Sequence, residues 1–281
     1  MPKSRAFAQV DVFTSRPTMG NPVAVVLDGE GLSDAEMQAF AHWTNLSETT
    51  FVTPAGADDE ADYAVRIFTP RSELPFAGHP TLGTAHALIE AGHIVPIDGI
   101  VRQRSAVGLV EVTVSAAGLS FRLPKAHIRA APDRDRLQAA LPDCPLLTRP
   151  DIVNVGPHWI VAECAPDALA ALTPDYPALA DYERAQQATG LTLYAVTSPD
   201  SIMVRSFAPS DGITEDPVCG SGNGAVAAYR LLNGQIDPTS RYTARQGQQA
   251  GRDGTVSVTL KDGHIDIGGS CVTLISGTVT L

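Results

Sequence analysis

Short runs of apolar and polar residues predict that the first half of the chain consists mostly of strands. Residues 6–13 alternate loosely and residues 62–68 alternate cleanly, while residues 22–27 form a β-branched run. Residues 108–114 and 119–123 flank a Ser-Ala-Ala-Gly turn. Alternation is typical of a half-buried strand, and two such runs around a short turn are typical of a hairpin. The pattern therefore predicts a sheet with few helices.

One helix is predicted among these strands. Ser33 is followed three residues later by Glu36, which is the spacing of a capping box. Met37, Phe40 and Ala41 then fall on one helical face. We therefore expect a helix that begins at Ser33.

The second half of the chain repeats this order of elements. Strands are predicted in SIMVRSFAP and at residues 158–164, 191–197, 255–260, 264–267 and 271–281. Helical sequence occupies residues 166–188. Prolines and charges gather at residues 124–135, which are the candidate linker between two domains.

Two stretches, offset by 142 residues, are versions of one another. Residues 75–92 (PFAGHPTLGTAHALIEAG) and 217–234 (PVCGSGNGAVAAYRLLNG) each have a Pro-x-x-Gly turn, a helix of small residues and a terminal glycine. The offset is about half of the chain, which indicates a duplicated domain. We predict an α+β fold with two pseudo-equivalent lobes, residues 1–124 and 125–281, and an active site in the cleft between them. The last strand, near 272–281, can pack with the N-terminal lobe.

Composition and charge narrow the class of protein. A net charge of −11 and a pI near 5.0 argue against nucleic-acid binding, which needs a basic face. No apolar run approaches the ~20 residues of a membrane span, and the first residues lack a signal-peptide core. The four cysteines show no spacing typical of a metal site. We expect a cytoplasmic, reduced protein that uses no metal.

Each glycine-rich turn leads into a helix N-terminus, where backbone N–H groups lack intrahelical partners and the helix dipole adds positive charge. Gly78 and Gly220 would let an anion approach these amides closely. For either turn alone, glycines that serve tight packing are the simpler alternative. Two turns in register, each with polar groups at its tip, favour a site for one small anion.

Four polar side chains lie at or near these turns. His79 is suited to proton transfer near neutral pH, and a helix N-terminus would keep its imidazole neutral; a capping or surface histidine is the alternative. Asp216 and Ser221 flank the second turn, where helix-dipole and N-cap roles compete with catalysis. Glu48, in NLSETTFV just ahead of a strand expected near Thr50, would be a surface glutamate if taken alone.

Cys219 lies at the N-terminus of the second repeated helix, where the pKa of a thiol can fall into the reactive range. Its counterpart in the first repeat is Ala77, so the sequence lacks a symmetric pair of thiol bases. We expect Cys144, Cys164 and Cys271 to be packing residues.

Motifs along nearly the whole chain carry a family resemblance. GNPVAVV, NLSETTFV, FTPRSELPFAGHPTLGTAH, EDPVCGSGNGA and RQGQQAGRDG occur in this order, and with them the sequence resembles the PhzF-like isomerases of phenazine biosynthesis. The resemblance implies a diaminopimelate epimerase-like fold, in which each lobe is a β-barrel-like sheet around a central helix. It also implies a homodimer that works without a cofactor and isomerises a small carboxylic acid, such as trans-2,3-dihydro-3-hydroxyanthranilate.

The resemblance also implies roles for the candidate residues. Glu48 would take a proton from carbon, and His79, Asp216 and Ser221 would share in proton return and substrate holding. The candidates for substrate binding are Gly78, Gly220, Cys219 and Asn21.

Two alternatives stay open. One is an amino-acid or hydroxy-acid epimerase in which Cys219 acts with Glu48 or His79 as the opposite base. The other is a non-catalytic protein that binds a small molecule with the same fold. The full set of polar groups at the two turns argues against the second alternative.

Overall fold

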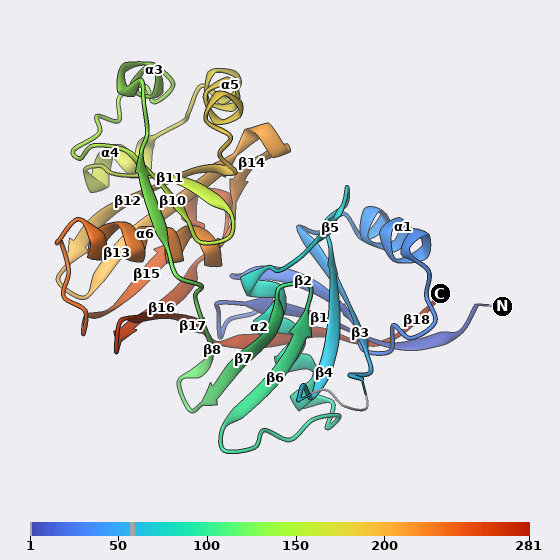
Figure 1. Ribbon diagram of the computed structural model, residues 1–281. Helices are drawn as coiled ribbons and strands as arrows, with labels where there is room; N and C mark the ends of the chain where they lie inside the picture. The colour runs from blue at the N-terminus through green and yellow to red at the C-terminus, as the bar shows by residue number, and fades with distance from the viewer. Residues whose placement is uncertain (1, 57–59) are drawn as a thin grey trace. The chain divides into compact units, whose positions relative to one another are not determined.

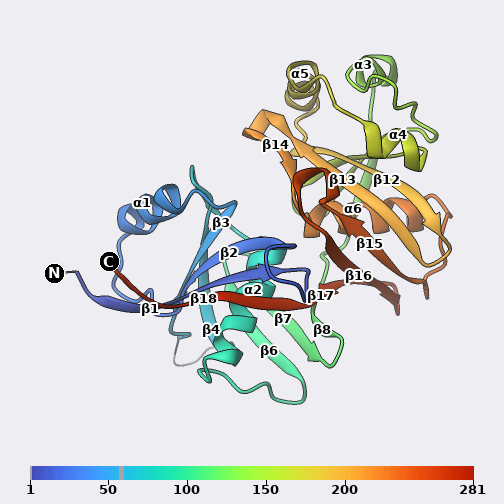
Figure 2. The same ribbon diagram turned by 180° about the vertical axis from the view of Figure 1, so that it is seen from behind.

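The computed structural model describes residues 2–56 and 60–281. Met1 and residues 57–59, which fall in the predicted N-terminal lobe, lie outside the described residues. The chain forms two compact units, which Figures 1 and 2 show from opposite sides. Unit 1 comprises Met1–Arg122 and Gly268–Leu281, and unit 2 comprises Leu123–Ile267.

Unit 1 is a mixed sheet with two helices. Its strands are β1 (Ser4–Val12), β2 (Asn21–Val26), β3 (Glu48–Thr53), β4 (Tyr63–Phe68), β5 (Glu73–Leu74), β6 (Ile100–Ser105), β7 (Gly108–Ser115), β8 (Gly118–Arg122) and β18 (Cys271–Thr280), and its helices are α1 (Asp34–Thr44) and α2 (Gly78–Glu90). The strands pair in the order β18-β1-β2-β3-β4-β6-β7-β8, with β2–β3 and β4–β6 parallel and the other pairs antiparallel. β5 pairs with the end of β4.

Unit 2 repeats this arrangement. Its strands are β9 (His127–Ala130), β10 (Asp151–Asn154), β11 (His158–Glu163), β12 (Gly190–Ser198), β13 (Ser201–Ala208), β14 (Ile213–Asp216), β15 (Arg241–Gln246), β16 (Gly254–Lys261) and β17 (His264–Gly269), which leads out of the unit. Its helices are α3 (Arg134–Ala139), α4 (Pro166–Ala171), α5 (Tyr176–Gln186) and α6 (Gly220–Leu232), with 3₁₀ turns η1 (Pro209–Asp211) and η2 (Gln248–Ala250). The strands pair in the order β9-β10-β11-β12-β13-β15-β16, in which β11–β12 and β13–β15 are parallel and the other pairs are antiparallel. These two parallel pairs correspond to β2–β3 and β4–β6 of unit 1.

One helix in each unit touches several strands of its own sheet. α2 contacts β1, β2, β3 and β8, and α6 contacts β10, β11, β12 and β16. Both helices have 13 residues, and their first residues are Gly78 and Gly220. Gly92 and Gly234, just beyond the two helices, have φ of +71° and +69°, the left-handed conformation of a helix stop. The predicted α+β class and the repeat of a central helix are confirmed.

Local signals in unit 1 act as the sequence predicts. Ser33 is the N-cap of α1, and its hydroxyl and the carboxylate of Glu36 form both hydrogen bonds of a capping box. Met37, Phe40 and Ala41 are buried on the inner face of this helix. The capping box therefore sets where the helix begins, and its apolar face sets how it packs.

Several elements differ from the prediction. The candidate linker contains β9, which pairs with β10, and β3 begins at Glu48 itself. β6 and β15 were not predicted, and the buried face of each includes a glutamine beside apolar residues such as Val101 and Ala244. Gln103 and Gln246 are fully buried and hydrogen-bonded inside their units, so apolar alternation does not mark these strands.

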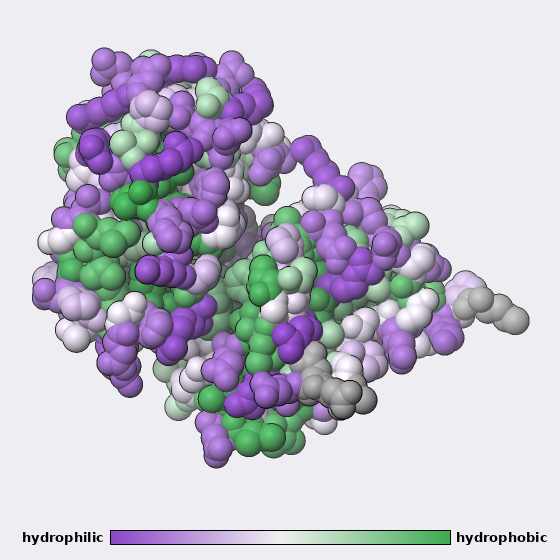
Figure 3. All heavy atoms as spheres, viewed as in Figure 1, coloured by the Kyte–Doolittle hydropathy of each residue, from purple (hydrophilic) through white to green (hydrophobic). Residues whose placement is uncertain are grey.

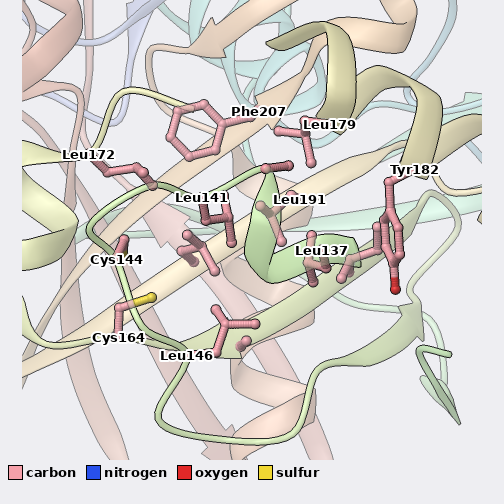
Figure 4. Close-up of a cluster of buried hydrophobic side chains, with 14 of the residues drawn as sticks. Leu137, Leu141, Cys144, Leu146, Cys164, Leu172, Leu179, Tyr182, Leu191 and Phe207 are labelled. Carbon is pink, nitrogen blue, oxygen red and sulfur yellow. The ribbon is translucent and has the colours of Figure 1, made fainter. Parts of the chain in front are cut away.

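One hydrophobic cluster of unit 2 joins residues of α3, α4 and α5 to the strands β10, β11, β12 and β13. Figure 4 shows Cys144 and Cys164 among Leu141, Leu146 and Leu172 in this core. Both cysteines are buried, which confirms that they pack in the interior. The outer surface over α3 and α5 is mostly hydrophilic in Figure 3. Of the helices in the described part of the chain, none is long and apolar enough to cross a membrane.

Candidate active site

The first group of candidate residues lies where β2, β3 and α2 of unit 1 meet. Glu48 is the first residue of β3, and it lies opposite Val23 of β2 in a parallel pair. His79 is the second residue of α2. The Nε2 atom of His79 lies 3.3 Å from Oε2 of Glu48, and the two side chains are only 7% and 15% exposed. Tertiary packing thus makes Glu48 an inward-facing partner of His79 rather than a surface residue.

Burial keeps the imidazole of His79 neutral. It lowers the pKa of His79 to about 3, and a hydrogen bond to Pro22 opposes this shift. Because proline has no N–H, the carbonyl of Pro22 accepts this bond from the ring. Nε2 faces Glu48, so Nδ1 is the donor and Nε2 is left as an acceptor. The sequence predicted a neutral imidazole, and the first cause is burial rather than the helix N-terminus.

The contact between Glu48 and His79 has a chemical consequence. A neutral imidazole nitrogen and a carboxylate oxygen are both acceptors, and two acceptors 3.3 Å apart attract only when one of them carries a proton. The pair is therefore arranged to hold one proton between its two members. That is the property required of a group that removes a proton and returns it.

The other candidates of unit 1 surround this pair. Asn21, the first residue of β2, is fully buried and directly precedes Pro22, whose carbonyl accepts from His79. Ala77 is the N-cap of α2 and offers no side-chain hydrogen bond to the first turn. A Cβ on Gly78 would lie 2.7 Å from Cζ of Phe121, so the glycine is needed for packing. Gly78 is also the first residue of α2, so its backbone amide belongs to the first turn, where N–H groups lack intrahelical partners.

The second group of candidates lies in unit 2, where β14 leads into α6. Asp216 is the last residue of β14, and its Oδ1 accepts a hydrogen bond of 3.0 Å from the amide of Val218. Burial raises the pKa of Asp216 to about 6, although hydrogen bonds from Cys219 and Val218 lower it. A carboxyl group with this pKa exists in both protonation states near neutral pH, which suits proton transfer.

The carboxylate next to Asp216 is bound by a different partner. Arg205 makes two hydrogen bonds to Glu215, of 2.9 and 2.7 Å, and also donates to the carbonyls of Leu169 and Leu172. Arg205 is buried, so this bidentate pair anchors β14 to the interior of unit 2. Of the two adjacent acidic residues, Glu215 is therefore the one that Arg205 holds.

Cys219 is a buried residue at the start of α6. It is the N-cap of α6, and its Sγ accepts from the amide of Gly222 at 3.2 Å. Burial first, and then the neighbouring Asp216, raise the pKa of the Cys219 thiol well above its ordinary value. Burial therefore acts against the lowering of the thiol pKa that a helix N-terminus can produce, because it disfavours the thiolate.

Ser221 is the second residue of α6, the same place in its helix that His79 has in α2. Its Oγ accepts a hydrogen bond of 3.0 Å from Nε1 of Trp159 and lies 3.6 Å from Sγ of Cys219. The alternative of Ser221 as N-cap is wrong, since Cys219 fills that role. Gly220, the first residue of the helix, is buried beside them.

Two residues that the sequence analysis missed support the second group. Gln246 accepts from the amide of Cys219 at 3.2 Å and from the side chain of Asn223 at 2.8 Å, and it donates to the carbonyl of Asp216 at 3.0 Å. Gln246 lies in the motif RQGQQAGRDG, which contributes to the family resemblance but did not indicate a role for this residue. Trp159, in contrast, had no signal beyond an ordinary strand pattern.

Comparisons with known proteins find the same family along nearly the whole chain. The family model for phenazine biosynthesis-like proteins matches residues 10–277. Antisense-enhancing sequence 1 of Schizosaccharomyces pombe is 38% identical over 97% of both chains. Trans-2,3-dihydro-3-hydroxyanthranilate isomerase of Pseudomonas fluorescens is 34% identical over 97% of this chain and 98% of its own. The crystal structure of a phenazine biosynthesis protein from Bacillus anthracis matches with a TM-score of 0.86 at 25% identity, covering 99% of this chain and all of its own.

Proposed function

This chain belongs to the phenazine biosynthesis-like (PhzC-PhzF) family and is an isomerase, and on that premise we propose that it moves a proton between two carbons of a small carboxylic acid. The Glu48–His79 pair is the proton-transfer group, and the reaction needs no cofactor. The single observation that carries this proposal is the contact of 3.3 Å between Nε2 of the buried His79 and Oε2 of the partly buried Glu48.

The proposed reaction has two steps. In the first, a carboxylate oxygen of Glu48 takes a proton from carbon, and the electron pair of the broken C–H bond stays on the substrate as a dienolate-like anion. In the second, the Glu48–His79 pair returns a proton to another carbon, a new C–H bond forms and the double bond moves. The sum is an isomerisation, so no other reactant is consumed. A positioned base of this kind contributes about 10²–10⁴-fold to the rate.

The starts of the two central helices and the residues beside α6 have a holding role in this proposal. The uncapped amides at the start of α2 and the amide of Gly220 suit the substrate carboxylate, because helix N-termini favour anions. Ser221 donates to an oxygen of the substrate, and Asp216, whose pKa is about 6, can exchange a proton with it near neutral pH. It is part of the proposal that residues of both units serve one substrate. The substrate class follows the Pseudomonas fluorescens relative, whose name specifies a cyclic hydroxy amino acid.

The experiment is proton NMR in D₂O with trans-2,3-dihydro-3-hydroxyanthranilate and a panel of small amino and hydroxy acids. We expect the wild-type protein to isomerise the first compound and Glu48→Gln to do so about 10²–10⁴-fold more slowly, with binding retained. Glu111→Gln, at an exposed glutamate of the same unit, is the matched control and should react at the wild-type rate. Wild-type turnover by Glu48→Gln would overturn the assignment of the base.

The epimerase alternative makes a different prediction. It requires Cys219 to act as a base, whereas burial raises the pKa of this thiol. Exchange at Cα of a panel acid that disappears in Cys219→Ala would establish the epimerase. We expect Cys219→Ala to keep the isomerisation that depends on Glu48.

A further inference from the structure

A buried indole donates to one of the proposed substrate-holding residues. Trp159, in β11, is 4% exposed, and its Nε1 donates to Oγ of Ser221 at 3.0 Å. An indole N–H is only a donor, so the hydroxyl oxygen accepts this bond and the hydroxyl hydrogen must point elsewhere. Trp159 therefore restricts the direction in which Ser221 can donate.

The backbone of the neighbouring strand provides the space for this indole. Trp159 lies opposite Gly190 in the parallel pair of β11 and β12. A Cβ on Gly190 would lie 2.6 Å from Cζ3 of Trp159 and 2.2 Å from the carbonyl oxygen of Phe207. Only a residue without a Cβ fits beside the indole in this position. Packing as well as hydrogen bonding thus fixes where the indole lies.

The hydrogen of the Ser221 hydroxyl has only a weak acceptor in its described surroundings. That acceptor is Sγ of Cys219, at 3.6 Å, and a thiol sulfur is a weak acceptor. The same sulfur already accepts from the amide of Gly222 at 3.2 Å. A carboxylate or other oxygen of a ligand would replace the sulfur as the acceptor, because a charge-assisted bond is about twice as strong as a neutral one.

We infer that Trp159 is a positioning residue, which holds the Ser221 hydroxyl as a hydrogen-bond donor toward an anionic oxygen of the substrate. The inference rests on the proposed function, since it requires Ser221 to contact a carboxylate-bearing substrate. It adds that the effect of Trp159 on binding passes through Ser221. In the absence of Ser221, Trp159 has no hydroxyl to orient.

The test measures binding rather than turnover, so a failure of Glu48 as the base would not affect it. The probe is 3-hydroxyanthranilate, a stable aromatic relative of the compound in the Pseudomonas fluorescens enzyme's name, titrated by calorimetry. We expect Trp159→Phe, which keeps an aromatic ring but loses the donor, to weaken binding about 3- to 10-fold, the value of one hydrogen bond. In a Ser221→Ala background the same substitution should change binding less than twofold. An equal loss in both backgrounds, or no loss in either, would overturn the inference.

A second readout does not depend on the Trp159 variant folding. The chain has two tryptophans, and Trp43 is 79% exposed, so Trp43→Phe leaves Trp159 as the sole indole reporter. We expect the indole N–H resonance of Trp159 to shift when the probe binds, and Ser221→Ala to move the free resonance and abolish the probe-induced shift. A resonance that ignores the probe while calorimetry records binding would overturn the inference. Absence of any binding to the wild type would overturn the substrate class in the proposed function, and the inference with it.

Discussion

The same corner of the fold occurs twice, and it carries different chemistry in the two units. In unit 1 the parallel pair β2–β3 places Val23 opposite Glu48, and in unit 2 the parallel pair β11–β12 places Trp159 opposite Gly190. Glu48 and Gly190 are the first residues of corresponding strands. The position that Glu48 has in unit 1 is thus occupied by Gly190 in unit 2, which has no side chain. The indole of Trp159, from the neighbouring strand β11, fills the space.

The side chains that these residues reach are also equivalent. Glu48 approaches His79, and Trp159 donates to Ser221, each the second residue of its central helix. Unit 1 therefore holds a pair that can share a proton, while unit 2 holds a pair that can only orient a hydroxyl donor. The place at the helix N-terminus is thus the same in both units and the side chains differ: under the proposed function, Glu48 and His79 of unit 1 transfer the proton and Ser221 of unit 2 helps to hold the substrate.

The hydrogen bonds that hold the starts of the two helices are, in contrast, alike. Gln103 of β6 donates to Thr81 of α2 at 3.0 Å, and Gln246 of β15 accepts from Asn223 of α6 at 2.8 Å. In both units a buried glutamine thus ties a neighbouring strand to the fourth residue of the helix. A buried amide without partners would be costly, so both networks fix the helix start. The two units therefore share the backbone arrangement at the helix start, and they differ in the side chains that lie there.

The variant expected to have the largest effect on this comparison adds a Cβ at Gly190. Gly190→Ala should lower the free energy of unfolding by about 1–3 kcal/mol, because the new Cβ would meet the carbonyl oxygen of Phe207 and the indole of Trp159. Urea unfolding measures the change. Gly56→Ala is the control, since nothing lies within 4 Å of a Cβ there. Equal stability of both variants would mean that Gly190 does not make room for the indole.

The next effect concerns the pH dependence of His79. The pKa of His79 is about 3 in the folded protein and about 6.5 when unfolded, so below pH 6.5 the unfolded state takes up a proton that the folded state does not. The wild type should therefore lose up to about 2 kcal/mol between pH 6.5 and 5 relative to His79→Gln. Urea unfolding across this range measures the difference. Its absence, or an equal difference for the exposed His93→Gln, would contradict the buried neutral state.

An effect of similar size and opposite sign is expected for Asp216 in unit 2. The pKa of Asp216 rises from its ordinary 3.8 to about 6 on folding, so its ionisation opposes folding above pH 6. Asp216→Asn should therefore gain about 2 kcal/mol of stability at pH 8 relative to pH 4, because the amide still accepts from Val218. Thermal unfolding at the two pH values measures this gain. Asp237→Asn, at an exposed position, should show none, and a loss at pH 8 would refute the cause assigned to the shift.

Features with local causes could be predicted from the sequence. The capping box at Ser33 and Glu36 depends on side chains three residues apart, and the helix stops at Gly92 and Gly234 depend on a backbone conformation that glycine adopts freely. The repeat needed only the comparison of two stretches. The strand with Gln103 escaped prediction because its buried side chain is polar and finds its partners only in the folded unit.

The sequence by itself thus determined the α+β class, the duplication and the two glycine-led helices, since each is written in nearby residues. Tertiary structure alone decided the contact of Glu48 with His79 and that of Trp159 with Ser221, residues separated by 62 positions in the second case. It also decided that Cys219 is buried, which raises the pKa of its thiol, whereas a helix start can lower it. The physical reason is burial, which depends on what the rest of the chain places around a group and disfavours charge wherever water is excluded.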